Sequence, residues 1–224
     1  MQIKGPKYQL FDRFAQVAKA LSHAHKLELL ELLAQGERSV EALANVAGLT
    51  VANTSRHLQQ LRNAGLIESR KDGLYVFYRV SGDDVIDLLG CLRRTSERHF
   101  SEMNSVVTGY FNDRDSLEAI SRKELLRRSE AGLVTILDVR PAEEYDFGHI
   151  PGAVNVPLEH IEQYLRNLPK DQEVIAYCRG AYCVLAFEAI ATLREKGFQA
   201  RRLEEGYPEW KAAGLPVEKL PTEA

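Results

Sequence analysis

The chain of 224 residues is 45% hydrophobic and 27% charged, a composition typical of folded globular proteins that excludes disorder of the whole chain. No apolar run approaches the roughly 18 residues needed to span a membrane. The first residues also lack the apolar core of a signal peptide, so we expect a cytoplasmic protein without a membrane partner. The formal net charge is −3, but residues 1–105 hold 14 Lys and Arg against 12 Asp and Glu, a balance compatible with DNA binding.

The first half of the chain is predicted to be helical with one β-hairpin. Apolar residues at helical spacing indicate two helices within the first 35 residues, and Gly36 closes the second. Ser39 and Thr50 are typical N-caps, and Asp72-Gly73 between two apolar stretches is a strong hairpin signal. The remaining predicted elements are a helix over Val40–Ala47, a helix after Thr50 to about Asn63, strands over Leu66–Arg70 and Leu74–Val80, and a helix over Val85–Met103.

This order of elements is the layout of a winged helix-turn-helix. The helix after Thr50 is the one that fits a major groove, and the hairpin is the wing that meets the adjacent backbone. Hydroxyls and free backbone N–H groups at the helix start suit phosphates, polar side chains can read base edges, and small apolar ones can touch a thymine methyl. The predicted DNA contacts are Thr50, Val51, Ala52, Asn53, Ser55, Arg56 and Gln59 on the helix, and Arg70 and Lys71 on the wing. The alternative is a helical protein-interaction module with a basic hairpin.

Residues 10–105 resemble the ArsR/SmtB-type regulators. The resemblance is carried by the string from Leu49 to Leu61 and by the hairpin from Arg70 to Tyr78, and it implies a homodimer, paired through the first and last helices, that represses a pseudo-palindromic operator. Many relatives bind metal through cysteines before the recognition helix, but Ser39–Ala44 holds none. The last helix offers Asp84, Asp87 and His99 without a second histidine. Three or four placed ligands are needed for a tight site, so we expect no metal and no cofactor.

The second half of the chain is predicted to be an α/β domain with a parallel sheet. Periodicity fades near residues 104–116, so we divide the chain into a winged helix-turn-helix domain over 1–105, a linker over 106–116 and a second domain over 117–220. Beyond the linker, strands alternate with helices, as in parallel sheets. The predicted elements are a helix over Ser121–Ser129, a strand over Val134–Val139, a helix over Leu158–Leu168, a strand over Glu173–Tyr177, a helix over Ala181–Lys196 and a strand over Gln199–Leu203.

The sharpest chemical feature is the string from Tyr177 to Val184. An apolar strand leads to Cys178, and the next helix follows a short loop. Backbone N–H groups of such a loop, the helix dipole and the neighbouring Arg179 would lower the pKa of the thiol. A thiolate there can attack a sulfur donor and carry the sulfur as a persulfide. We therefore assign catalytic roles to Cys178 and Arg179, and the anion-binding loop to Gly180, Ala181, Tyr182 and Cys183.

Residues 117–217 resemble the rhodanese family. The matching motifs are Asp138-Val139-Arg140, Glu143-Glu144-Tyr145, Gly148 to Asn155, and Gly206-Tyr207-Pro208-Glu209-Trp210. The resemblance implies a sulfurtransferase-type fold with Cys178 as the sulfur-carrying nucleophile. We interpret Asp138, Arg140, His149 and Trp210 as structural residues.

The loop departs from the pattern of thiosulfate-using members, because its cation comes early and a cysteine ends it. Loss of a second cation should weaken binding of a small dianionic donor. Cys183, which we place on the first helical turn, could form a disulfide or polysulfide bridge with Cys178 if their Cα atoms lie within about 7 Å. A buried apolar role for Cys183 is an equal alternative. For Cys91, on the predicted dimer helix, we favour a packed residue over an intersubunit contact.

Together these features predict a DNA-binding regulator that responds to reactive sulfur. In the favoured hypothesis Cys178 takes up sulfane sulfur from a small molecule, or is oxidised, and operator affinity changes. The rival is a sulfurtransferase enzyme whose winged helix serves localisation or dimerisation. A third possibility is a regulator whose rhodanese-like domain is a passive appendage.

Overall fold

The computed structural model describes residues 5–106, 119–168, 170 and 172–219. Contacts between residues divide the chain into two units, Met1–Leu89 and Gly90–Ala224. The linker predicted over 106–116 lies, from residue 107 onward, outside the described residues. Within the described part of the chain, no helix is both long and apolar enough to cross a membrane.

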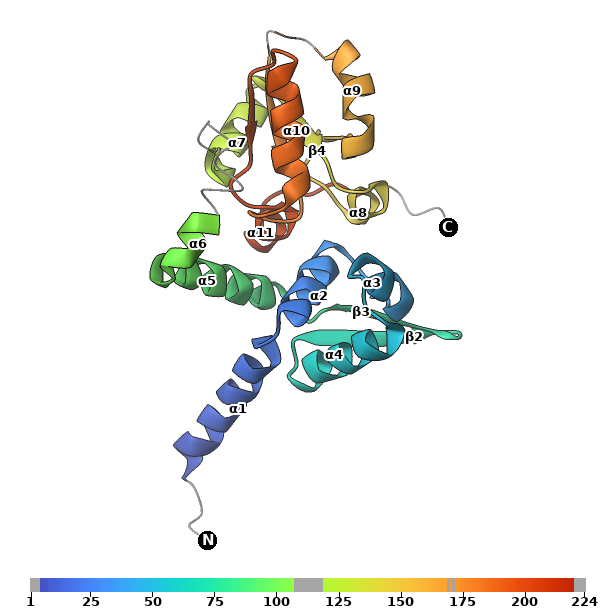
Figure 1. Ribbon diagram of the computed structural model, residues 1–224, viewed down its shortest axis with the longest axis vertical. Coiled ribbons are helices and arrows are strands. Elements are labelled where there is room, and N and C mark those ends of the chain that lie inside the picture. Colours follow the sequence, from blue (N-terminus) through green and yellow to red (C-terminus); the bar gives the residue numbers. More distant parts are fainter. Residues whose placement is uncertain (1–4, 107–118, 169, 171, 220–224) are drawn as a thin grey trace. The chain divides into compact units, whose positions relative to one another are not determined.

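The first unit is built from helices and one hairpin, in the predicted order (Figure 1). Both predicted N-caps are confirmed, because Ser39 Oγ accepts the N–H of Ala42 at 3.2 Å and Thr50 Oγ1 accepts the N–H of Asn53 at 3.3 Å. Its elements are α1 (Pro6–Leu21), α2 (Ala24–Gln35), β1 (Arg38–Ser39), α3 (Val40–Val46), α4 (Val51–Asn63), β2 (Ile67–Asp72), β3 (Tyr75–Val80) and the start of α5 (Asp83–His99).

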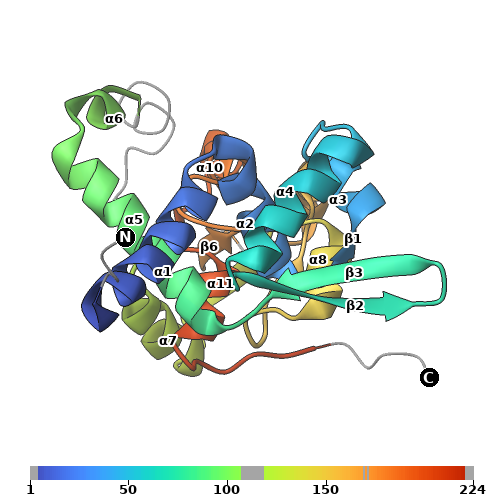
Figure 2. The same ribbon diagram turned by 90° about the horizontal axis from the view of Figure 1, so that it is seen from below.

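The hairpin forms a small antiparallel sheet against the helices (Figure 2). Gly73 and Leu74 make its two-residue turn, and Gly73 has a φ of 58°, a conformation that glycine adopts without a steric penalty. The two-residue strand β1 pairs with β3, giving the order β1-β3-β2. This strand was not predicted, because two residues are too short to show a period. A core of leucines from α2, α3 and α4 lies beneath the sheet.

The long helix predicted over Val85–Met103 is two helices, and this expectation was wrong. α5 ends at His99, and α6 (Ser101–Val106) begins after Phe100. Val85 and Ile86 of α5 are buried, and Val85 belongs to the core of the first unit. Cys91 is exposed, which corrects the expectation that it is packed within the chain. From Cys91 to His99, every residue of α5 is either exposed or half-buried.

The second unit confirms the predicted parallel sheet, with the strand order β5-β4-β6-β7. Three short elements, α8, β5 and α11, were not predicted. The helix expected over Leu158–Leu168 is instead one short helix between two 3₁₀ turns, and the helix expected from Ala181 begins three residues later. The elements are α7 (Arg122–Glu130), β4 (Val134–Asp138), α8 (Ala142–Phe147), β5 (Val154–Asn155), η2 (Leu158–His160), α9 (Ile161–Tyr164), η3 (Leu165–Asn167), β6 (Glu173–Tyr177), α10 (Val184–Glu195), β7 (Ala200–Arg202) and α11 (Tyr207–Ala212).

Helices cover both faces of this sheet (Figure 1). Successive side chains of a strand point to opposite faces. Accordingly, Val174, Ala176 and Cys178 pack with α9 and α10, whereas Ile175 and Tyr177 pack with α7 and α11. Cys178 therefore follows a strand buried on both faces, at its carboxyl end, where parallel sheets commonly present their functional groups.

Candidate nucleic-acid interface and cysteine loop

One face of α4 is polar and open to solvent, as a recognition helix requires. Thr54, Leu58 and Leu61 point into the core and are fully buried. The residues predicted to contact DNA are all exposed: Thr50, Val51, Ala52, Asn53, Ser55, Arg56 and Gln59. The helix thus brings the seven predicted contacts together on one accessible surface.

The wing carries less free positive charge than the sequence suggests. Arg70 forms ion pairs with Glu37 at 2.7 Å and with Asp72 at 2.8 Å, and its guanidinium lies over the Phe77 ring. Hydrogen bonds to Glu37 and then Asp72 raise the pKa of Arg70 further above its ordinary value. Lys71 is exposed, and the tip of the hairpin presents Leu74, which is 96% exposed. The hairpin therefore presents an exposed lysine and an apolar tip to solvent, while the charge of Arg70 is shared with two acids.

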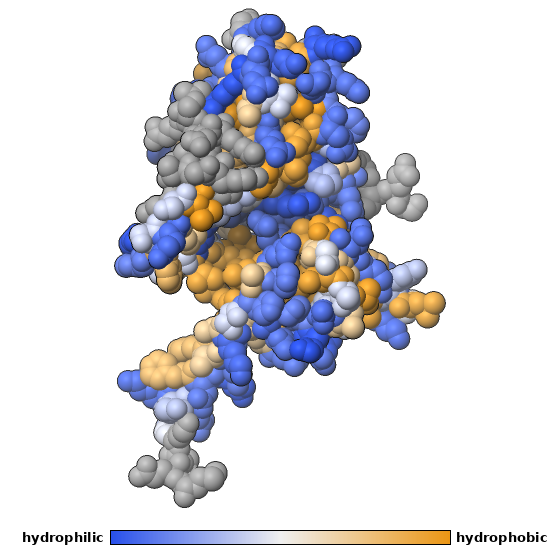
Figure 3. All heavy atoms as spheres, viewed as in Figure 1, coloured by the Kyte–Doolittle hydropathy of each residue, from blue (hydrophilic) through white to orange (hydrophobic). Residues whose placement is uncertain are grey.

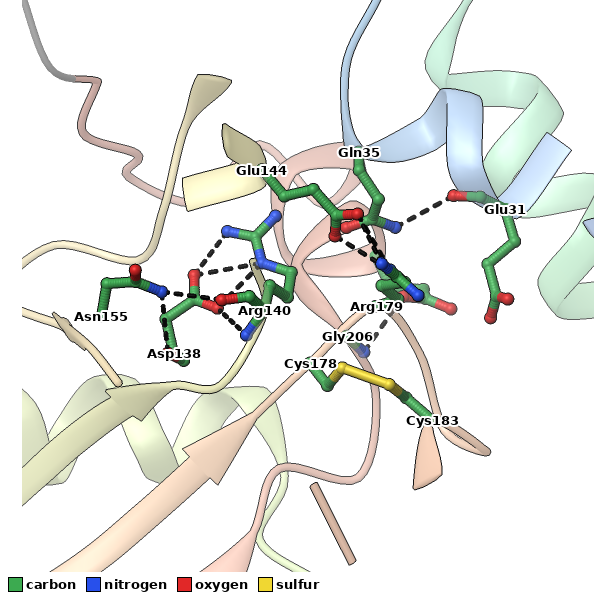
Figure 4. The surroundings of a disulfide bond; sticks show 11 residues. Glu31, Gln35, Asp138, Arg140, Glu144, Asn155, Cys178, Arg179, Cys183 and Gly206 are labelled. Atoms are coloured by element: carbon green, nitrogen blue, oxygen red, sulfur yellow. Dashed lines mark hydrogen bonds and ion pairs between the residues drawn. A yellow bond between two sulfur atoms is a disulfide. The ribbon is translucent and has the colours of Figure 1, made fainter. Parts of the chain in front are cut away.

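Cys178 and Cys183 form a disulfide across the loop between β6 and α10 (Figure 4). Their Cα atoms lie 6.1 Å apart, within the range that a disulfide spans. Cys183 is the N-cap residue of α10, which begins at Val184. The prediction that Cys183 lies on the first turn of this helix is therefore wrong. Cys178 is buried, whereas Cys183 is partly exposed. Of the two alternatives left open for Cys183, the structure therefore shows the disulfide with Cys178.

Arg179 points toward Glu144 and away from the two sulfur atoms (Figure 4). Its guanidinium forms two parallel bonds to that carboxylate, at 2.7 and 2.9 Å, and Glu144, on α8, is fully buried. Such a bidentate pair fixes both groups. Arg179 therefore holds the loop against α8, and its charge is balanced by an acid that the sequence-based site did not include.

Gly206 allows the loop to approach the start of α11. A Cβ built at this position would come closer than 3.0 Å to the backbone of Arg179 and Gly180. The N–H of Tyr207 donates to the carbonyl of Cys178 at 3.0 Å. The cysteine loop is thus held from a second side by the backbone that follows β7.

The four residues interpreted as structural lie in the interior of the second unit. Asp138 and Arg140 form an ion pair with no solvent exposure, and Arg140 also donates to the carbonyl of Gly148 at 2.8 Å. His149 Nδ1 lies 3.0 Å from the carbonyl of Tyr145. Trp210 Nε1 donates to Pro216 at 2.7 Å. Their positions away from solvent agree with roles in holding the fold.

The end of α5 contacts the cysteine loop within the second unit. The hydroxyl of Tyr182 donates to Glu97 Oε1, and Arg93 lies 3.0 Å from the same carboxylate. Burial and this hydrogen bond raise the pKa of Tyr182 to about 12. Glu97 was not predicted as part of the site, because it lies 85 residues away in sequence.

Comparisons with known proteins give two families for the two halves. The model for bacterial regulatory proteins of the arsR family matches residues 24–69, and the model for rhodanese-like domains matches residues 121–213. The HTH-type transcriptional regulator Rv0324 of Mycobacterium tuberculosis is 43% identical over 213 residues, which cover 95% of this chain and 93% of that protein.

Two further similarities cover one half of the chain each. A sulfurtransferase of Allochromatium vinosum is 32% identical over 85 residues, 38% of this chain and 78% of that protein. A solution NMR structure of the homodimeric winged helix-turn-helix DNA-binding domain of Mb0332 from Mycobacterium bovis is 37% identical. It covers 46% of this chain and 94% of that one, with a TM-score of 0.41.

Proposed function

Because the chain belongs to the ArsR family of bacterial transcriptional regulators and carries a rhodanese-like domain, we propose that it is a repressor whose operator affinity depends on reactive sulfur at Cys178. The observation that carries this proposal is the Cys178–Cys183 pair on the loop after β6. A dithiol that can close to a disulfide gives a regulator two covalent states. A signal must stabilise such states differently to shift DNA binding.

The proposed chemistry uses a persulfide, RSSH, as the sulfur donor. The Cys178 thiolate attacks the outer sulfur of the donor, which forms a persulfide on Cys178 and releases RSH after proton transfer. The Cys183 thiol then attacks the Cys178 sulfur, which forms the disulfide and releases H₂S. The two protein thiols are oxidised, and one sulfane sulfur is reduced to sulfide.

The site favours a donor of low charge. Arg179 is the loop's cation, and its guanidinium is engaged by the buried Glu144. A small dianion such as thiosulfate would compete with Glu144 for that guanidinium, whereas a persulfide or hydrogen polysulfide would not. The amides of Gly180 and Ala181 make no hydrogen bond to another backbone group among the described residues, and they are the donors that we propose for a single negative charge.

We propose that the repressor acts as a homodimer on a double-stranded operator. Four large side chains on α1 are 47–62% exposed: Tyr8, Leu10, Phe11 and Phe14. Figure 3 shows hydrophobic atoms on the surface of this helix, at the lower left of the view. A contiguous apolar patch on a helix favours association with another surface. Pairing of two copies would present two α4 helices to successive major grooves.

The test is binding of an operator fragment, selected from random DNA by the reduced protein, at one fixed salt concentration. Wild type, Cys178→Ser and Cys91→Ser are compared with and without polysulfide. We expect polysulfide to release wild type and Cys91→Ser, the control with the exposed free cysteine, but not Cys178→Ser. A Cys178→Ser protein that is released like wild type refutes the proposal.

The same proteins test the rival function. If polysulfide leaves operator binding by wild type unchanged, sulfur transfer to an acceptor such as cyanide is measured next. Turnover that depends on Cys178, without any change in DNA binding, identifies a sulfurtransferase that the winged helix merely localises.

A further inference from the structure

The end of α5 is tied to the rhodanese-like unit at the cysteine loop and beside it. Glu97 accepts the hydroxyl of Tyr182, the residue directly before Cys183. Arg93, one turn earlier, pairs with Glu97 at 3.0 Å and lies 4.0 Å from Glu205. Glu205 precedes Gly206, whose backbone touches the other side of the loop. The end of α5 therefore contacts the disulfide loop directly at Tyr182, and its preceding turn lies near the residue before Gly206, which packs on the loop.

We propose that Glu97 is a positioning residue for the cysteine loop, acting through the Tyr182 hydroxyl, and that α5 carries the sulfur state of the loop to the DNA-binding unit. This inference rests on the proposed function, because it names the route by which Cys178 controls operator affinity. It assigns a role in sulfur sensing to a side chain that lies outside the rhodanese-like match of residues 121–213.

The closing of the disulfide bears directly on Tyr182. In the oxidised chain the Cα atoms of Cys178 and Cys183 are held 6.1 Å apart, and Tyr182 lies in the turn between them. When the bond opens, Cys183 is no longer held to Cys178, and the turn gains conformational freedom. In the reduced chain, the hydrogen bond from the Tyr182 hydroxyl to Glu97 must then hold a more mobile turn in place, which costs more conformational entropy. The strength of this contact should therefore differ between the two sulfur states.

The other end of α5 belongs to the core of the first unit. Val85 is part of that core, the neighbouring Ile86 is also buried, and the same helix continues without interruption to His99. A helix is stiff along its length, because each turn is bonded to the next. A change in how Glu97 is held is thus passed along α5 to residues that pack beneath the winged-helix sheet. Coupling of two sites requires an element that takes two arrangements, and we propose that α5 is this element.

The experiment measures sulfur uptake and DNA binding separately on the full chain. Disulfide formation after polysulfide treatment is followed by thiol alkylation and intact mass, and operator Kd is measured for reduced and oxidised protein. The variants are Tyr182→Phe, Glu97→Ala and Glu97→Gln. Tyr164→Phe is the matched control, since Tyr164 is another half-buried tyrosine packed against the core of the second unit.

We expect Glu97→Ala to form the disulfide like wild type but to lose the response. Tyr182→Phe, which changes a residue of the loop itself, should lose the response as well, whatever its rate of disulfide formation. The ratio of oxidised to reduced Kd, typically about 5- to 150-fold in allosteric proteins, should fall to within about twofold of one. Glu97→Gln, which keeps an oxygen acceptor, and Tyr164→Phe should retain most of the ratio. The double variant Tyr182→Phe with Glu97→Ala should lose no more than either single one, because both remove the same contact.

Three outcomes overturn this inference while leaving the proposed function intact. The first is a Kd ratio in Tyr182→Phe that equals the wild-type ratio. The second is a fall of this ratio in Glu97→Gln as large as in Glu97→Ala. The third is a fall in the control Tyr164→Phe as large as in Tyr182→Phe. A wild-type protein with a ratio of one instead refutes the proposed function itself. Thermal unfolding of each variant guards against misfolding, and Tyr182→Phe removes only one hydroxyl.

Discussion

The close approach at Gly206 predicts that one added methyl group will loosen the cysteine loop. In Gly206→Ala, the new Cβ would overlap three backbone atoms, two of Arg179 and one of Gly180. Backbone cannot rotate away as a side-chain end can, so the loop or the start of α11 has to shift by on the order of 1 Å to reach ordinary contact. Overpacking of this kind costs about 1–3 kcal/mol. For a unit of this size, that corresponds to a fall in Tm of about 3–12 °C.

The assay is thermal unfolding followed by circular dichroism, together with the rate of disulfide formation on addition of polysulfide. We expect both a lower Tm and slower closure of the Cys178–Cys183 bond, because the shift displaces the loop that carries both sulfur atoms. The control is Gly90→Ala in the interior of α5, where the new Cβ meets only the flexible end of Arg94, at 3.2 Å. Alanine should stabilise that helix by about 0.5–1 kcal/mol. A Gly206→Ala protein that matches wild type in Tm and closure rate would show that the loop is not seated as described.

Three further changes test other contacts. Glu144→Gln leaves Arg179 without its buried acid and should lower the free energy of unfolding by about 2–4 kcal/mol in denaturant titrations, whereas a loss no larger than that of the exposed Asp146→Asn would contradict the pairing. Arg56→Ala on α4 should weaken operator binding and reduce the slope of log K against log salt by about 1; Arg166→Ala, which removes an exposed arginine of the second unit, should leave the slope unchanged. Burial, and then His23, Lys26, His25 and Arg56, lower the pKa of His57. A depressed pKa in the folded state gives stability that is present above the ordinary value of about 6.5 and lost as pH falls through the folded value. The free energy of unfolding of the wild-type protein should therefore fall from pH 7.5 to 5.5, and it should fall less in His57→Asn. The same fall in both proteins would show that His57 does not cause this pH dependence.

The DNA-binding half could be predicted from the sequence because its signals are local. The caps at Ser39 and Thr50 and the glycine at the hairpin turn each act within a few residues of themselves. The exposure of the predicted contacts on α4 follows from a helical period that buries Thr54, Leu58 and Leu61. Where the local signal was only a period, as over Val85–Met103, the break at Phe100 was missed.

The cysteine loop was located from its motif, but the groups that hold it were not. Glu144 and Arg179 are 35 residues apart, and Glu97 and Tyr182 are 85 apart, so only the fold brings them together. The sequence indicated that Arg179 supplies charge to the sulfur, because the two residues are neighbours in the chain. Its guanidinium turns to a buried acid instead, a choice that depends on where α8 lies. Pairings across a fold escape pattern reasoning even when both partners lie in recognised motifs.

The short sequence separation of Cys178 and Cys183 limits how much their disulfide contributes to the stability of the folded chain. The two cysteines are five positions apart, so the bond closes a ring of few residues. The entropy that a cross-link removes from the unfolded chain grows with the size of its ring, and for a ring this small it amounts to about 2 kcal/mol. Most of the native structure is therefore secured by the two cores of the second unit, whichever covalent state the sulfurs are in. Because the bond closes so small a ring, opening it removes less stabilisation than opening a long-range disulfide would, and the bond can be made and broken while both cores stay packed.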